Sequence, residues 1–280
     1  MNCKRAFGAS ELLVSPIGLG CSRLGSVLGA RHEKSEELIK VALDNGINFF
    51  DTSNIYAQGE SERILGKVTK GVPDVVICTK VGKYLPLAKQ LIVPFKPIIS
   101  FLASKNKAVR GGVRQARSNG LPSDWNPAKI RKSVESSLRR LQRDHVHVLM
   151  LHSPPHEFLQ RGDAIGALAS LKAEGKIGVI GVSVDDPVAA QVALDDNRVE
   201  ALQIPLHPSS NEYDEIIETA YSRGVAIVAR EVLGGPNVIG KKILLGDAVA
   251  ARMDEASTRR GVTLALLGTT NVDHLKEIII

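Results

Sequence analysis

Hydrophobic and polar residues alternate along this chain in two repeating patterns. Short apolar runs, typical of strands that are covered on both faces, predict strands at 17–20, 48–52, 75–80, 145–152, 177–184, 201–204, 225–230 and 264–269. Apolar residues at helical spacing predict helices at about 36–45, 61–69, 127–141, 165–174, 187–195, 214–222, 247–259 and 271–280. Eight strand–helix alternations in a chain of this length predict an α/β fold, the (β/α)8 TIM barrel.

Local signals refine the limits of several elements. Two extended pieces around Gly8-Ala9-Ser10 predict a short N-terminal β-hairpin within residues 4–16. Ser61 is the expected N-cap of the helix after the second strand, and Asn126-Pro127 is a strong helix opening further on. We therefore expect a single barrel domain over residues 1–280, with a long insertion at about 83–123, after the third strand.

A doubly wound parallel sheet is the main alternative fold. It would need a glycine-rich phosphate loop after its first strand. The segment Gly18-Leu19-Gly20-Cys21-Ser22-Arg23 lacks the third glycine of that pattern. The barrel is therefore favoured.

The composition, with 44% apolar and 24% charged residues, is that of an ordinary globular protein. Three cysteines without a Cys-x-x-Cys pair indicate a reducing compartment. The sequence shows no signal-peptide pattern and no apolar run long enough to cross a bilayer. We therefore expect a cytoplasmic protein.

The formal net charge of +6 is distributed unevenly along the chain. No Asp or Glu occurs between Val81 and Ser123, a stretch that contains eight Lys and Arg residues. Such a segment could bind nucleic acid or an anionic membrane, but it has few aromatic residues for stacking and contains apolar pieces such as 91–93. We expect no nucleic-acid or membrane partner, and interpret the segment as a partly folded loop at the barrel mouth.

In a (β/α)8 barrel the carboxyl ends of the strands form the face that carries active sites. Polar residues stand at the ends of seven consecutive predicted strands: Asp51, Lys80, His152, Ser183, Gln203, Arg230 and Thr269. Asp51 also shares one strand-to-helix junction with Tyr56. Each residue alone has a structural explanation, such as a solvated strand end or a hydrogen bond at the rim. Together they predict a polar mouth on an apolar core.

Over essentially its whole length the chain resembles the aldo-keto reductases. The matching motifs, in the order and spacing of that family, are Phe50-Asp51-Thr52 with Tyr56, Gly59 and Ser61-Glu62; Thr79-Lys80; Ser136 to Leu141; Leu151-His152; and Gly181-Val182-Ser183. The resemblance implies a catalytic tetrad of Asp51, Tyr56, Lys80 and His152, without a metal ion. It also implies an NAD(P)-dependent oxidoreductase that transfers a hydride between nicotinamide and a carbonyl or alcohol substrate, which is an aldehyde, ketone or sugar.

The same resemblance implies where the cofactor, NADP or NAD, would bind. Ser183 and Gln203 fall at the nicotinamide pocket, and the segment from Leu267 onward resembles the part that holds the phosphate and adenosine. The cofactor residues so implied are Gly20, Ser183, Gln203, Arg230, Gly268, Thr269, Thr270, Asn271, His274 and Glu277. No Lys or Arg stands at the usual basic positions of the family, so we expect NADP to be only modestly preferred.

The residue types suit the reduction of a carbonyl group. Hydride transfer leaves an alkoxide that needs a proton, and a tyrosine hydroxyl with an ordinary pKa near 10 can supply it. A neighbouring cation lowers that pKa, which is the role expected of Lys80, while Asp51 keeps the lysine charged and fixed. A histidine beside the carbonyl oxygen, His152, can orient the substrate and help to polarise it.

The sequence departs from the family at several positions. Val184 replaces the usual asparagine after the serine, and Arg230 stands where many members stack an aromatic residue on the nicotinamide. Ile278 replaces an asparagine near the adenine. The family normally continues past the last barrel helix, whereas this sequence stops at Ile280, so the tail is either absent or truncated.

Two other functions fit parts of the sequence. His145 and His147 could be paired ligands of a metal-dependent hydrolase barrel, but they open their strand, at the opposite end from His152. A non-catalytic nucleotide-binding barrel, acting as a sensor or accessory subunit, would have no need of a Tyr–Lys acid. The sequence names neither the physiological substrate nor the oligomeric state.

Overall fold

The computed structural model describes residues 4–26, 29–86, 106, 121–208, 210–234 and 246–279. Its main feature is a closed barrel of eight parallel strands that follow the order of the chain, with the last strand paired to the first. The strands are β3 (Ile17–Gly20), β4 (Phe49–Asp51), β5 (Val76–Val81), β6 (Val146–His152), β7 (Ile177–Ser183), β8 (Ala201–Pro205), β9 (Ala226–Arg230) and β10 (Leu264–Leu267). The predicted (β/α)8 barrel is confirmed.

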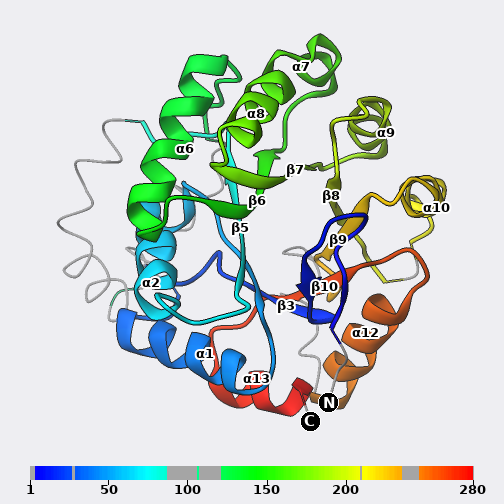
Figure 1. Cartoon of the computed structure of the whole chain (residues 1–280). Helices are drawn as coiled ribbons and strands as arrows, with labels where there is room; N and C mark the ends of the chain where they lie inside the picture. Colours follow the sequence, from blue (N-terminus) through cyan, green and yellow to red (C-terminus); the bar gives the residue numbers. More distant parts are fainter. Residues whose placement is uncertain are drawn as a thin grey trace.

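Helices alternate with the strands and surround the barrel (Figure 1). They are α1 (His32–Asp44), α2 (Glu60–Val68), α6 (Pro127–Leu141), α7 (His156–Arg161), α8 (Asp163–Ala173), α9 (Pro187–Asp195), α10 (Asp214–Ser222), α12 (Gly246–Thr258) and α13 (Val272–Ile279). A short 3-10 segment, η1 (Tyr56–Gly59), precedes α2. The helices α9 and α10 have the predicted limits, whereas the six-residue α7 was not predicted.

The predicted N-terminal hairpin is also confirmed. It consists of β1 (Arg5–Ala6) and β2 (Leu13–Val14), which pair antiparallel. Its apolar side chains Phe7 and Val14 belong to the same buried cluster as the barrel interior, and the Phe7 ring stacks on Phe49 with centroids 5.6 Å apart. Because Phe49 begins its strand, the hairpin closes the amino-terminal end of the barrel. The opposite end is the one left for a functional site.

The ends of the long insertion lie side by side. Lys83 and Ser123 form an antiparallel bridge, and the Tyr84 amide donates a hydrogen bond to the Pro122 carbonyl at 3.0 Å. Next to this bridge, the Trp125 ring lies so close to Gly82 that a side chain there would collide with it. Most of the insertion, and with it the predicted partly folded loop at 83–123, lies outside the described residues.

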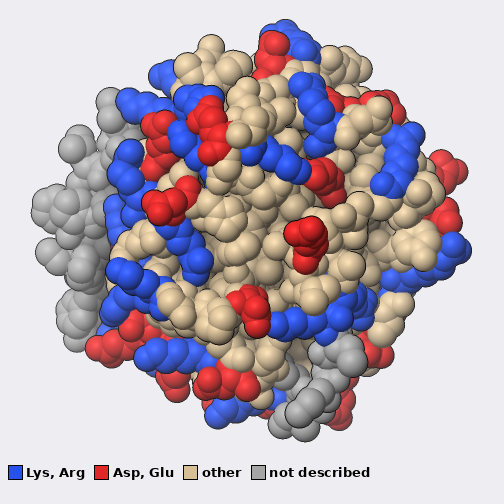
Figure 2. Space-filling view, in the orientation of Figure 1, with Lys and Arg blue, Asp and Glu red and all other residues tan. Residues whose placement is uncertain are grey.

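The surface of the described residues carries charges of both signs (Figure 2). On the face shown in Figure 2, acidic and basic side chains of the described residues are interspersed around a largely uncharged centre. This arrangement differs from the single-sign surface that binds nucleic acid. None of the described helices is long and apolar enough to cross a membrane.

Candidate active site

Strand alternation decides which side chains enter the barrel mouth. Side chains two residues apart point to the same face of a strand, and Phe49, Cys78 and Met150 belong to the buried cluster inside the barrel. The inward positions that follow them are Asp51, Lys80 and His152. The same rule extends the interior positions Ala201 and Val228 to Gln203 and Arg230. The apolar interior thus ends in a layer of polar and charged groups.

Lys80 and Asp51 form a buried ion pair in this layer. Lys80 is 1% exposed, and its Nζ donates to Asp51 Oδ1 at 2.5 Å and to the Thr52 carbonyl at 3.1 Å. Burial lowers the pKa of the lysine, but the negative charge of Asp51 outweighs that effect and the pKa is raised above its ordinary value. The lysine is therefore charged at neutral pH.

Tyr56 lies on the strained segment η1, over this ion pair. Lys80 Nζ is 5.2 Å from the centre of its ring, and the two residues after it, Ala57 and Gln58, have positive φ angles of 49° and 60°, which cost energy in residues other than glycine. Burial raises the pKa of Tyr56, Lys80 lowers it, and the net pKa is above its ordinary value. Lys80 therefore lowers the pKa as expected, but burial outweighs it, and the hydroxyl is protonated at neutral pH.

His152 completes the group at the end of β6. Its ring stands edge-on to the Tyr56 ring with centroids 5.8 Å apart, and its Nδ1 lies 3.0 Å from Ser53 Oγ. Burial, followed by the positive charges of Lys80, Lys83 and Arg230, holds the pKa of His152 well below its usual range. The ring is neutral at physiological pH.

Ser183 and Gln203 form a second polar pair that touches the ion pair. Ser183 Oγ donates to Gln203 Oε1 at 2.9 Å, and Gln203 Nε2 donates to Asp51 Oδ1 at 3.0 Å. These two bonds distinguish the oxygen from the nitrogen of the Gln203 side-chain amide. They leave one N–H of Gln203 and the electron pairs of Ser183 Oγ available for a ligand. One donor beside one acceptor fits a primary amide, such as the carboxamide of nicotinamide.

This geometry agrees with what comparison with known proteins shows. The sequence profile of the Aldo/keto reductase family matches residues 16–277. The chain belongs to the aldo-keto reductase family. The resemblance expected from its motifs is confirmed.

Individual relatives support the same assignment. The chain is 30% identical to L-galactose dehydrogenase of Arabidopsis thaliana over 241 residues, which cover 82% of this chain and 65% of that protein, just under two thirds. It is 26% identical to 6-dehydroglucose reductase of Novosphingobium aromaticivorans, with coverage of 92% and 78%. Among solved structures, the aldo-keto reductase PA4992 of Pseudomonas aeruginosa superimposes with a TM-score of 0.76 at 25% identity, covering 99% and 93%.

Arg230, one of the departures from the family pattern, is held by the rim of the barrel. Its guanidinium donates to the Val184 carbonyl at 2.8 Å and to Glu231 at 2.6 Å, and it also pairs with Asp185. Val184, which replaces an asparagine, is fully buried. Arg230 therefore links the ends of β7 and β9, and its charge has two acidic partners.

The segment implied in phosphate and adenosine binding lies at the end of β10. A Cβ atom at Gly20 would lie 3.8 Å from Gly268 Cα, so these two glycines are neighbours across the β3–β10 junction. Thr269 Oγ1 accepts from the Asn271 amide at 3.1 Å, and Asn271 Oδ1 accepts from the Asp273 amide at 2.9 Å, at the start of α13. His274 and Glu277 are exposed on that helix, and Thr270 precedes it. A helix N-terminus of this kind favours an anion.

The start of α2 differs from the prediction. Its N-cap is Gly59, in the left-handed conformation with φ of 85°, and Ser61 is a buried residue inside the helix. Ser61 Oγ donates to the Cys21 carbonyl at 2.9 Å and lies 2.8 Å from Thr52 Oγ1. The predicted N-cap at Ser61 is wrong, because its hydroxyl fastens the helix to the barrel strands instead.

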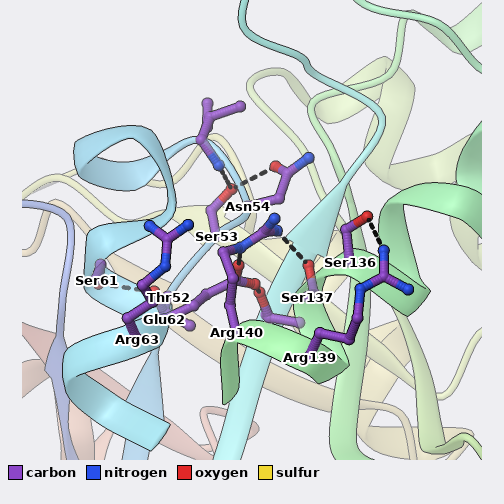
Figure 3. Close-up of polar contacts among 12 residues, drawn as sticks. Thr52, Ser53, Asn54, Ser61, Glu62, Arg63, Ser136, Ser137, Arg139 and Arg140 are labelled. Atoms are coloured by element: carbon purple, nitrogen blue, oxygen red, sulfur yellow. Dashed lines mark hydrogen bonds and ion pairs between the residues drawn. The ribbon is translucent and has the colours of Figure 1, made fainter. Parts of the chain in front are cut away.

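Glu62, the second residue of the Ser61-Glu62 motif, has a buried carboxylate. It is fully buried, accepts from Thr79 Oγ1 at 2.6 Å, and pairs with Arg140 Nε of α6 at 2.6 Å (Figure 3). Arg140 also donates to Ser137 at 3.1 Å and passes over Gly59. A Cβ atom at Gly59 would lie 2.7 Å from Arg140 Cδ, so the glycine leaves space for the arginine.

His145 and His147 lie at the start of β6, far along the strand from His152. Their rings are in contact with centroids 4.8 Å apart, and His147 Nδ1 accepts a hydrogen bond from the Ile77 amide at 3.1 Å. Among the described residues no three His, Cys, Asp or Glu side chains are grouped so that they could hold a metal ion. In the part of the chain that the structure describes, these histidines therefore do not support the alternative of a metal-dependent hydrolase.

Proposed function

We propose that this protein is an NAD(P)-dependent oxidoreductase that reduces a small aldehyde, ketone or sugar to the alcohol and catalyses the reverse oxidation. The observation that carries the proposal is the buried Asp51–Lys80 ion pair, 2.5 Å between Nζ and Oδ1, beneath the ring of Tyr56. A protein that only binds a nucleotide would gain nothing from an ion pair at that place.

Tyr56 is the proton donor in this proposal. When bound, NAD(P)H supplies the hydride to the carbonyl carbon. The tyrosine hydroxyl gives its proton to the carbonyl oxygen, and Lys80 stabilises the tyrosinate that is left. Asp51 holds Lys80 in place, and His152 orients the substrate. The Tyr56 hydroxyl stays protonated at neutral pH, as a proton donor must be, because its pKa is not lowered.

The cofactor residues we propose are those at the barrel mouth. Ser183 and Gln203 would offer an acceptor and a donor to the carboxamide. Thr269, Thr270 and Asn271, directly before α13, would hold the phosphate. Hydroxyl and amide groups can form hydrogen bonds with either a 2′-hydroxyl or a 2′-phosphate. NAD and NADP should therefore both bind, and NADP should bind modestly more tightly. A Kd for NADP more than about a thousandfold below the Kd for NAD, a difference of roughly 4 kcal/mol in binding free energy, would contradict this part of the proposal.

The experiment that tests the function is a carbonyl-substrate panel with NADPH and with NADH, run on the wild type and on Tyr56→Phe. The variant should bind cofactor normally while reduction falls by about 10² to 10⁴, the usual contribution of general acid catalysis. Tyr221→Phe, which removes a hydroxyl from an exposed residue of α10, is the matched control. Near-normal reduction by Tyr56→Phe would remove the tyrosine from the mechanism.

A further inference from the structure

We propose that a cleft on the outer wall of the barrel, between α2 and α6, binds a small phosphorylated metabolite of the sugar phosphate class. The cleft has a volume of about 470 Å³, and its lining residues are Arg63 of α2 with Ser136, Arg139, Arg140 and Gln142 from the end of α6 and the position after it. Cavities of this size typically hold small ligands. None of these residues belongs to the barrel mouth, so the inference does not depend on the proposed function.

The two walls of the cleft are fixed before a ligand arrives. A Cβ atom at Gly66 would lie 2.4 Å from the Leu141 carbonyl oxygen, so the backbones of α2 and α6 are in contact there. The ion pair of 2.6 Å between Arg140 Nε and the buried Glu62 holds the same two helices together. A ligand therefore meets side chains on two helices whose positions are already set, which reduces the cost of ordering on binding.

The charges around the cleft favour an anion. Arg63 is paired with Glu60 of its own helix. Arg140 is paired with Glu62, whose carboxylate is fully buried. Arg139 has no acidic partner among the described residues. Three arginines and two glutamates leave one positive charge, and neither glutamate is among the described residues that line the cleft.

The helix dipoles explain only part of this arrangement. Arg139 and Arg140 stand in the last turn of α6, where a cation is favoured by the dipole. Arg63 is the fourth residue of α2, near the positive end of that helix, where the dipole disfavours a cation. Its presence on the same cleft is therefore not accounted for by the stability of either helix, whereas a bound anion accounts for all three arginines.

The arginines also keep hydrogen-bond donors that no described residue uses. A guanidinium has five N–H groups. Among the described residues, Arg140 uses two of them, and Arg63 and Arg139 use one each. Figure 3 shows Arg140 between the other two arginines, and all three line the same cleft. Because guanidinium groups bind phosphate oxygens through paired N–H donors, a phosphate group suits the charged part of the cleft.

The rest of the lining is polar and uncharged. Ser136 Oγ donates to the Lys132 carbonyl at 2.9 Å and accepts from Arg139 at 2.9 Å, which leaves it one electron pair. The side-chain amide of Gln142 makes no hydrogen bond within the described part of the chain, and the residue is exposed. These groups can form hydrogen bonds with the hydroxyl groups of a sugar. The cleft therefore fits a phosphate monoester with a hydroxylated organic part better than phosphate alone.

Calorimetric titration of the full-length protein, in a buffer without phosphate or sulfate, tests the site. The three titrants are glucose 6-phosphate, inorganic phosphate and glucose. Glucose 6-phosphate should bind at one site with a Kd of about 1 mM or lower, as two or three charge-assisted hydrogen bonds provide. Phosphate should bind more weakly, and glucose should not bind measurably. The absence of binding by glucose 6-phosphate would overturn the site, and equal binding by phosphate would overturn the sugar phosphate class.

Variants show where the ligand binds. Arg63→Gln and Arg139→Gln should each raise the Kd about tenfold or more, with unchanged circular dichroism spectra. Arg131→Gln is the matched control, because it removes the same charge from an α6 residue that pairs with Glu174 and does not line the cleft. The control should bind as the wild type does. An equal loss in Arg131→Gln, or unchanged binding in Arg139→Gln, would overturn the site.

The cofactor separates this cleft from the barrel mouth. Saturating NADP should leave the Kd for glucose 6-phosphate unchanged, whereas competition would place the sugar phosphate at the barrel mouth and overturn the proposal. The titrations need no turnover, so their outcome is independent of the Tyr56→Phe test of the proposed function.

Discussion

Gln203 donates a hydrogen bond from Nε2 to Asp51 Oδ1 across 3.0 Å. The same carboxylate oxygen accepts from Lys80 Nζ at 2.5 Å. A side chain proposed to hold the nicotinamide thus touches the carboxylate proposed to fix the lysine. The proposed cofactor site and the proposed proton donor therefore share one hydrogen-bonded network.

This link predicts the effect of Gln203→Met, which keeps the size of the side chain and removes both its donor and its acceptor. Ser183 loses its partner, and Asp51 loses one of its donors. Hydrogen bonds to charged groups contribute about 1.5–3 kcal/mol, so kcat/KM should fall roughly 10- to 100-fold, with a higher Kd for the cofactor. Steady-state kinetics and fluorescence titration check this, and an unchanged Kd together with unchanged kcat would contradict the link.

Lys80→Met should separate the two directions of the reaction. Without the cation, the effect of burial on Tyr56 is opposed only by the smaller effect of Arg230, and the pKa of its hydroxyl rises further. Alcohol oxidation needs the tyrosinate, so its pH–rate profile should move to higher pH. Carbonyl reduction uses the protonated tyrosine and should become slower without such a shift.

The measurement is a pH–rate profile in both directions for the wild type, Lys80→Met and the exposed control Lys129→Met. A circular dichroism melt of each variant shows whether the barrel is intact. An oxidation profile of Lys80→Met that overlays the wild-type profile would show that the lysine does not act on the tyrosine.

Arg140→Ala should destabilise the fold strongly. It leaves the buried Glu62 carboxylate without its cation, and removing one partner of a buried pair costs about 3–5 kcal/mol. Glu62→Gln in the same chain should restore part of the loss. Urea unfolding measures the effect, with Arg139→Ala as control. Arg139 is exposed, and among the described residues its side chain donates only to Ser136, at 2.9 Å. A loss below about 1 kcal/mol in Arg140→Ala would show that the pair is unimportant.

His147 should make the barrel sensitive to acid. Burial and the neighbouring His145 and Arg143 lower the pKa of His147 from 6.5 to about 4. Between these pH values the unfolded chain binds a proton that the folded chain does not, so stability falls as the pH falls through this window. His147 is only partly buried, which reduces the expected effect to about 1 kcal/mol.

His147→Asn keeps an acceptor for the Ile77 amide and removes the titrating group. Its unfolding free energy should therefore change less than that of the wild type between pH 6.5 and pH 4, whereas His156→Asn, on the partly exposed first residue of α7, should behave as the wild type. If the unfolding free energies of His147→Asn and the wild type fell equally between pH 6.5 and pH 4, His147 would be excluded as the acid-sensitive group.

The insertion should be dispensable for folding. Because Lys83 and Ser123 already form a bridge, residues 86–120 can be replaced by Asn-Gly, which favours a two-residue hairpin turn. The shortened chain should keep the circular dichroism spectrum of the barrel and change its substrate preference more than its melting temperature. A chain that no longer folds would place the insertion in the core.

Patterns within one segment were sufficient to predict much of this structure. The limits of α9 follow from Asp186 and Pro187, and the Asp186 side chain accepts from the Ala189 amide at 2.8 Å, as an N-cap does. The polar residues that end the strands, such as Asp51, Lys80 and His152, do lie at one mouth of the barrel. Side chains alternate along each strand, and the closed barrel fixes how neighbouring strands are aligned. The position of a residue within its own strand therefore decides where its side chain lies.

Features that depend on distant contacts were not predictable. The burial of Glu62 depends on Arg140, which is 78 residues away. The net pKa of Tyr56 depends on how burial balances Lys80 and Asp51, and residue types alone do not give that balance. The helix α7 has six residues directly after Pro155, too few for a helical period to be detected.

The contact between Gly59 and Arg140 limits how this protein can change over generations. A side chain at position 59 would collide with Arg140. The loss of Arg140 would leave the buried carboxylate of Glu62 without its cation. In a lineage of such proteins, these positions should therefore be exchanged in a fixed order, with Glu62 neutralised first and Gly59 replaced last. Any other sequence of steps passes through an ancestor whose barrel is weakened before the replacement arrives.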